Sequence, residues 1–97
     1  MAIGDKALLR ILEEIAREEG FRALASEQGR LRLAQLLSSR VGEKMSTAEV
    51  QALLGTGRET TRRLLRSLKM RGVVQGIAGS KAQRVTRYLC RKVEEPG

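Results

Sequence analysis

The chain has 97 residues, of which 41% are hydrophobic and 31% charged, and its formal net charge is +8. This composition indicates one globular domain spanning residues 1–97 rather than a disordered chain. No apolar run is long enough to cross a membrane, and the charged N-terminal stretch does not resemble a secretory signal. The composition therefore predicts a protein that does not enter the membrane.

The residues needed for metal binding and catalysis are scarce. Cys90 is the only cysteine, and there is no histidine, so neither an internal disulfide nor a structural zinc site is expected. There is also no glycine-rich phosphate loop and no general base near Cys90. We expect no enzyme activity, no cofactor and no metal, and a location in the reducing cytoplasm.

The positive charge is concentrated in one part of the sequence. Up to Gly57 there are eight Lys/Arg and eight Asp/Glu, which cancel. From Arg58 onward there are eleven Lys/Arg against three Asp/Glu, which accounts for the whole net charge. A contiguous basic half predicts a surface that meets a polyanion, although a solvated basic face would have the same composition.

A first helix is predicted over residues 5–19, between Asp5 as its cap and Gly20 past its end. Its apolar sector is about 200° wide, whereas one core contact needs only about 100°. The surplus predicts a homodimer contact through Leu8, Leu9, Leu12 and Ile15. The alternative is that this helix packs wholly inside its own chain.

Three further helices have clear start and stop signals. Ser26 can cap a helix that reaches about Val41, and Ser46 with Glu49 forms a capping box that opens a helix closed by Gly55. The stretch from Thr56 to Glu59 repeats the capping-box pattern and opens a helix over 58–71 that stops at Gly72. The short turn over 55–57 sets the last two helices at a steep angle.

A hairpin is predicted after Gly72. Residues 73–78 indicate one strand, 79–83 a turn, and 84–91 a second strand with alternating faces. Lys81 and Arg84 bracket the tip, and Arg87 lies farther along the second strand. We expect Tyr88 to pack against the base of the hairpin.

The stretch "STAEVQALLGTGRETTRRLLRSLKMRGVV", residues 46–74, closely resembles the winged helix-turn-helix superfamily of prokaryotic transcription regulators. The matching features are Leu54-Gly55, Thr60, Leu65 with Leu68, and Gly72 followed by two valines. Where many members have Ser and Val, this chain has Gly57 and Thr61. The resemblance covers residues 26–92, with 93–97 as a tail. It implies a mostly helical α+β fold, in which three helices and a β-hairpin wing follow an extra N-terminal helix, and Lys44-Met45 could supply a short first strand.

The resemblance implies that helix 58–71 enters the major groove of DNA. Helical periodicity places Leu64, Leu65 and Leu68 on the buried side and the basic side chains on the other. The candidate DNA contacts are Arg58, Thr60, Arg62, Arg63, Arg66 and Lys69 on the helix, Lys81 and Arg84 on wing 79–84, and Arg87 beyond it. We expect Glu59 to cap the helix and Met70 to pack at its periphery.

The sequence thus predicts a double-stranded DNA-binding protein of the nucleoid, a transcriptional regulator in function. A homodimer would place two such helices about 34 Å apart, one duplex turn. About six phosphate contacts would give a log–log salt slope near −5. Two other functions fit the same pattern: a winged-helix module that binds proteins in a larger complex, and a chromosomal or RNA-binding protein without sequence preference.

Overall fold

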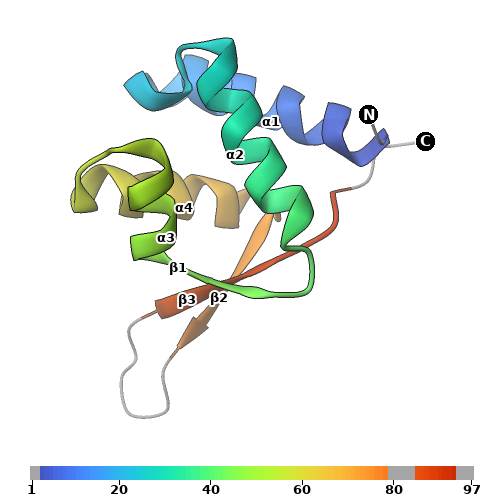
Figure 1. The fold of residues 1–97 in the computed structure, drawn as a ribbon, viewed down its shortest axis with the longest axis vertical. Helices are drawn as coiled ribbons and strands as arrows, with labels where there is room; N and C mark the ends of the chain where they lie inside the picture. The colour runs from blue at the N-terminus through green and yellow to red at the C-terminus, as the bar shows by residue number, and fades with distance from the viewer. Residues whose placement is uncertain (1–2, 79–84, 94–97) are drawn as a thin grey trace.

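The computed structural model describes residues 3–78 and 85–93, which form four α-helices, a short 3-10 helix and a three-stranded antiparallel sheet (Figure 1). The predicted α+β, mostly helical class is confirmed. In chain order the elements are α1 (Ile3–Glu19), the 3-10 helix η1 (Arg22–Leu24), α2 (Glu27–Ser39), β1 (Lys44–Ser46), α3 (Thr47–Leu54), α4 (Arg58–Met70), β2 (Val74–Ala78) and β3 (Val85–Cys90).

Side-chain caps fix where α2 and α3 begin. Ser26 precedes α2, and its hydroxyl accepts a hydrogen bond of 3.1 Å from the amide of Gly29. Ser46 and Glu49 form the predicted capping box, in which each side chain accepts from the backbone amide of the other residue. These bonds satisfy amides that a helix start leaves without partners. Two of the helix starts were therefore correctly predicted.

The N-terminal helix α1 packs against α2 and η1 of its own chain (Figure 1). Leu8, Leu12 and Ile15 are buried in the core, Leu12 and Ile15 completely. The wide apolar sector is explained by this position, because the helix has neighbours on more than one side. No helix in the described ranges has the length and apolar character needed to cross a membrane.

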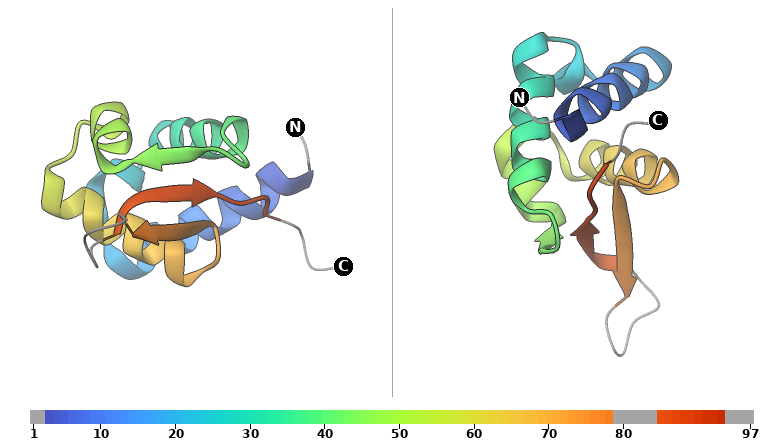
Figure 2. Two further views of the ribbon diagram at one scale, coloured as in Figure 1. Left: turned by 90° about the horizontal axis from the view of Figure 1, so that it is seen from below. Right: turned by 90° about the vertical axis from the view of Figure 1, so that its right-hand side faces the viewer.

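The strands are ordered β1-β3-β2, so the third of the described strands lies in the middle of the sheet. Met45 pairs with Tyr88 on one side of β3, and Gly76 pairs with Tyr88 on the other. Tyr88 and Cys90 lie on the same face of β3, as the alternation predicted, and both are buried in the core; Tyr88 is 8% exposed. In Figure 2, β2 and β3 run out from the helical body, so that the described end of this hairpin points away from the helices.

Candidate nucleic-acid interface

The turn between α3 and α4 is held by two threonine hydroxyls. Gly55 ends α3 with φ of 64°, a left-handed conformation that suits glycine. The Oγ1 atoms of Thr56 and Thr61 lie 2.6 Å apart, and Thr61 also donates to the carbonyl of Gly57 over 2.9 Å. Thr61 is fully buried. This pair of bonds ties the first turn of α4 to the turn that follows α3.

The predicted second capping box is wrong. The residue that precedes α4 is Gly57, which has no side chain to cap the helix, and Glu59 is exposed. The physical reason is that the Thr56 hydroxyl turns inward to Thr61 instead of toward the amides of α4. The hydroxyl of Thr61 therefore has a structural role that a valine could not fill.

Replacing Thr61 by Val should lower the free energy of unfolding by about 1 kcal/mol, because the half-buried Thr56 hydroxyl loses its partner. The double variant Thr56→Val/Thr61→Val should recover much of that loss, since removing both polar groups leaves none unpaired. Urea unfolding of the two variants and of Thr56→Val alone measures the coupling. Strictly additive losses would contradict the role assigned to this bond.

Helix α4 has one apolar side and one cationic side. Leu64, Leu65 and Leu68 are buried, and α4 packs against α3 and β2. On the opposite side Arg58, Arg66 and Lys69 are exposed and Arg62 is partly exposed. At 100° per residue these four side chains fall within about 80° of one another. The predicted separation of faces is therefore present.

The four cations of this face, Arg58, Arg62, Arg66 and Lys69, are called the cationic face below. Within the described ranges none of their charged groups forms a hydrogen bond or an ion pair. Glu59 is the acidic side chain on the same surface, and Thr60 is partly exposed in the first turn. Charges kept close together without internal partners repel one another slightly, so an outside anion would relieve them.

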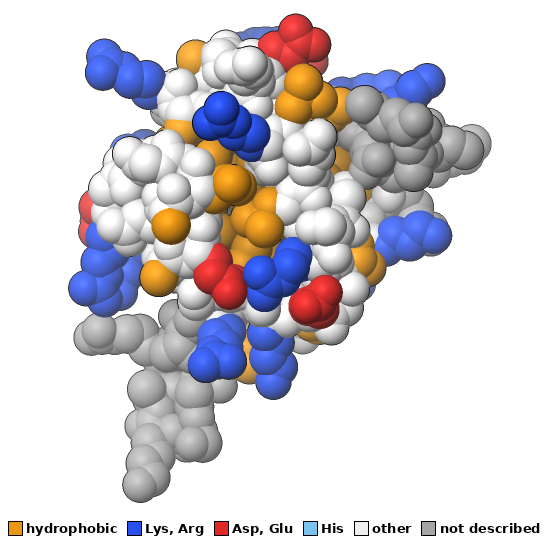
Figure 3. All heavy atoms as spheres, viewed as in Figure 1, with side chains coloured by type: hydrophobic (Ala, Val, Ile, Leu, Met, Phe, Trp, Pro, Cys, Tyr) orange, Lys and Arg blue, Asp and Glu red, His pale blue; other side chains and the backbone are white. Residues whose placement is uncertain are grey.

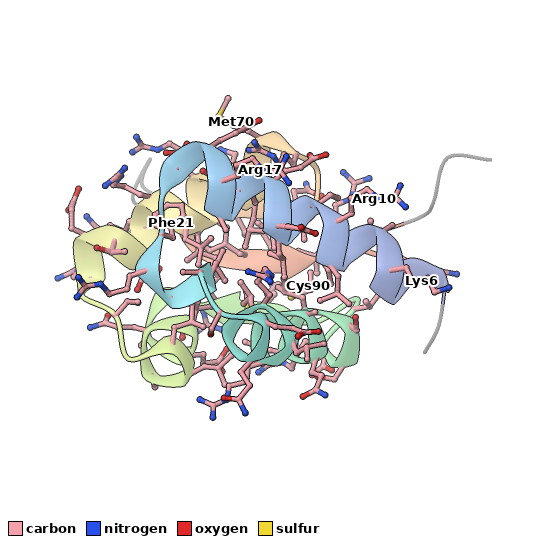
Figure 4. All side chains as sticks on the ribbon, turned by 90° about the horizontal axis from the view of Figure 1, so that it is seen from above. Lys6, Arg10, Arg17, Phe21, Met70 and Cys90 are labelled. Carbon is pink, nitrogen blue, oxygen red and sulfur yellow. The ribbon has the colours of Figure 1, made fainter. Side chains whose placement is uncertain are left out.

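Met70 differs from its prediction. It was expected to pack at the periphery, but it is 80% exposed at the end of α4 and projects outward (Figure 4). The helix ends there, and Gly72 follows with φ of 77°. The last turn therefore presents an apolar side chain beside the cationic face.

Arg63 lies at the border of the cationic face rather than at its centre. Its Nη2 is 3.7 Å from Oε2 of Glu19, and its guanidinium carbon is 5.5 Å from the centre of the Phe21 ring. Its side chain is still 55% exposed. Arg63 is thus engaged by the end of α1 while half of its surface remains open to solvent.

Two more contacts join α4 to the end of α1. The Ser67 hydroxyl donates to Oε1 of Glu19 over 3.4 Å, and Arg71 forms an ion pair with Glu18. Residues 63, 67 and 71 recur every fourth position and so share one side of the helix. Sequence reasoning missed Glu18, Glu19 and Phe21. The spacing of residues 63, 67 and 71 indicates that this side of α4 faces a polar partner. It does not indicate which acidic residues of the chain form that partner.

Of the hairpin residues predicted to contact DNA, the structure describes Arg87 alone. Arg87 is exposed on β3, opposite Ser46 and Ile77 in the neighbouring strands. Lys and Arg side chains also appear beside the strands, at the lower end of the face in Figure 3. Lys81, Arg84 and the predicted wing 79–84 lie outside the described residues.

The residues predicted for a dimer contact are mostly internal. Leu8, Leu12 and Ile15 are buried within one chain, so they are not available to a second copy. Leu9 is partly exposed at the edge of the core. For these three residues the alternative holds, in which the helix packs inside its own chain. A homodimer stays a prediction, but its contacts would have to come from other side chains.

Cys90 lies buried in the central strand. Burial raises the pKa of its thiol, and the nearby Arg40 guanidinium opposes this in part. A neutral buried thiol is a poor nucleophile, because the thiolate is the reactive form. No cluster of His, Cys, Asp or Glu suited to a metal occurs within residues 3–78 and 85–93.

The raised pKa of Cys90 predicts a loss of stability at alkaline pH. Above about pH 8.5 the thiol ionises in the unfolded chain but stays protonated in the folded one. Loss of this proton stabilises the unfolded state, so the free energy of unfolding falls as the pH rises. Unfolding curves between pH 7 and pH 10 should show declining stability, and Cys90→Ala should decline less steeply. Equal slopes for the two proteins would rule out this contribution.

Comparison of the chain with family models, with curated proteins and with solved structures finds no match.

Proposed function

We propose that this protein is a winged helix-turn-helix protein that binds double-stranded DNA and acts as a transcriptional regulator on the nucleoid. The order of α2, β1, α3, α4 and the β2–β3 hairpin is the order that the sequence resemblance implies. In this proposal α4 enters the major groove, while residues 79–84 contact the backbone or the minor groove. The proposal is one of binding without catalysis.

The observation that carries the proposal is the cationic face of α4. Arg58, Arg62, Arg66 and Lys69 stand on one side of a helix without partners within the described ranges. Arginine suits both phosphate and guanine, because its planar fork donates two parallel hydrogen bonds. Four unpaired cations on one helix favour an anionic partner over a neutral protein surface, since burying unpaired charge is costly.

The test is selection of bound duplexes from a random pool, followed by competition between the selected duplex and a random one in a gel-shift assay. We expect enrichment of a common motif and a log–log salt slope near −5, which corresponds to about six phosphate contacts. Binding to all duplexes alike would replace the regulator by a sequence-indifferent chromosomal protein. Absence of duplex binding would refute the proposal and favour a protein-interaction module.

A further inference from the structure

One arginine of α4 is held differently from those of the cationic face, and the following inference rests on the proposed DNA binding. Helix α1 lies outside the part of the chain that resembles winged helix proteins, yet its last residue reaches α4. The carboxylate of Glu19 meets two α4 side chains: Oε1 accepts from the Ser67 hydroxyl at 3.4 Å, and Oε2 lies 3.7 Å from Nη2 of Arg63.

Phe21 constrains the same guanidinium from a second direction. The residue follows α1, is 5% exposed, and lies beside α4 (Figure 4). The guanidinium carbon of Arg63 stands over the ring at 5.5 Å from its centre, which is within the range of a cation–π contact. Glu19 and Phe21 thus contact the same guanidinium, one through its charge and one through its ring. More than half of the side chain remains exposed.

An arginine held in this way is suited to reading a base. An unrestrained side chain loses about 2 kcal/mol of rotamer entropy when it is fixed, whereas a side chain already fixed by neighbours loses less. Phosphate contacts tolerate several side-chain positions and carry no sequence information, but a bidentate contact to O6 and N7 of guanine needs one defined position. Such precision usually comes from supporting side chains around the contact residue.

We propose that Arg63 reads a guanine in the major groove, and that Glu19 and Phe21 are positioning residues that hold its guanidinium for this contact. Arg58, Arg62, Arg66 and Lys69 then contact phosphates. The added helix α1 thus has a part in recognition without touching DNA. Glu19 could also act in the opposite sense, as a competitor that withholds Arg63 from phosphate, and the two roles predict opposite effects when its charge is removed.

The experiment uses the selected duplex, with each guanine replaced in turn by 7-deazaguanine, which lacks the N7 acceptor. At the guanine that Arg63 reads, we expect the substitution to weaken binding of the natural protein about tenfold, in line with the discrimination by a bidentate pair. Arg63→Ala should bind the duplex with guanine and the duplex with 7-deazaguanine at that position equally well, and should still distinguish them at other positions. Arg63→Lys should restore only a small part of the difference, because an ammonium lacks the planar fork of a guanidinium.

Glu19→Gln tests the positioning role. This variant keeps an acceptor for Ser67 but removes the charge that faces Arg63. We expect the 7-deazaguanine effect to shrink from about tenfold to about threefold, with binding to random duplex unchanged within about twofold. Glu18→Gln is the matched control, since it removes the same charge one residue earlier, from an ion pair with Arg71. It should leave the guanine effect intact, and thermal melting checks that both variants fold.

Two results would overturn this inference while DNA binding stands. One is that Glu19→Gln tightens binding to every duplex equally and leaves the 7-deazaguanine effect unchanged, which would make Glu19 a competitor. The other is that Arg63→Ala binds each 7-deazaguanine duplex with the same loss of affinity as the natural protein does. A protein that binds no duplex at all would overturn the proposed function, and this inference with it.

Discussion

Replacing the four residues of the cationic face, Arg58, Arg62, Arg66 and Lys69, by Gln is expected to weaken duplex binding about a thousandfold at ~0.1 M salt. Each phosphate contact contributes about −0.9 to the log–log slope, so losing four should change the slope from about −5 to between −1 and −2. The side chains are exposed or partly exposed and unpaired within the described ranges, so the fold should tolerate their replacement. Fluorescence anisotropy across a salt series measures both quantities.

The control removes the same charge elsewhere. Lys6, Arg17, Arg22 and Arg32 are exposed on α1, η1 and α2, and Lys6 and Arg17 lie on the outer side of α1 in Figure 4. Their replacement by Gln lowers the net charge equally but leaves α4 intact. We expect a much smaller loss of affinity and a slope still steeper than about −4. Equal losses in both variants would mean that total charge, not the cationic face, drives binding.

The second large effect is on stability. Leu12→Ala should lower the free energy of unfolding by about 3 kcal/mol, because Leu12 is fully buried and its loss leaves a cavity. The midpoint of urea unfolding should fall at an unchanged slope, and it should not depend on protein concentration. This loss is a large share of the 5–15 kcal/mol that stabilises an ordinary domain.

Leu9→Ala is the comparison variant for Leu12→Ala. Leu9 is partly exposed at the edge of the core, so its truncation should cost about 1 kcal/mol or less. If Leu12→Ala unfolded at the natural midpoint but changed the oligomeric state, Leu12 would belong to an interface between chains after all.

The fold could be predicted mostly where one residue decides a local structure. Ser26 and Ser46 fixed helix starts through hydrogen bonds to amides a few residues away, and Gly55 and Gly72 fixed helix ends through left-handed conformations. The same reasoning wrongly predicted that Thr56 caps α4. Its hydroxyl had two possible partners, the amides of α4 and the buried Thr61 hydroxyl, and it bonds to Thr61. A capping pattern does not reveal such competition from within the chain.

The candidate site was predictable to the extent that it follows helical periodicity. The outward positions of Arg66 and Lys69 follow from the buried positions of Leu64, Leu65 and Leu68. The contact between Arg63 and Glu19 does not, because the two residues are 44 positions apart and any acidic patch would fit the pattern. The width of the α1 apolar sector likewise indicated a second neighbour without indicating that the neighbour was the same chain.

The place of β3 in the middle of the sheet has a consequence for how the protein is made. Its neighbour β1 emerges about forty residues earlier during synthesis, and β2 also emerges first, so neither outer strand has a partner until residues 85–90 have left the ribosome. Local helices can form before that, but the sheet requires a long loop to close. Synthesis of residues 85–90 therefore completes both strand pairings together, and a chain truncated before Val85 would leave β1 and β2 without their partner and open to aggregation.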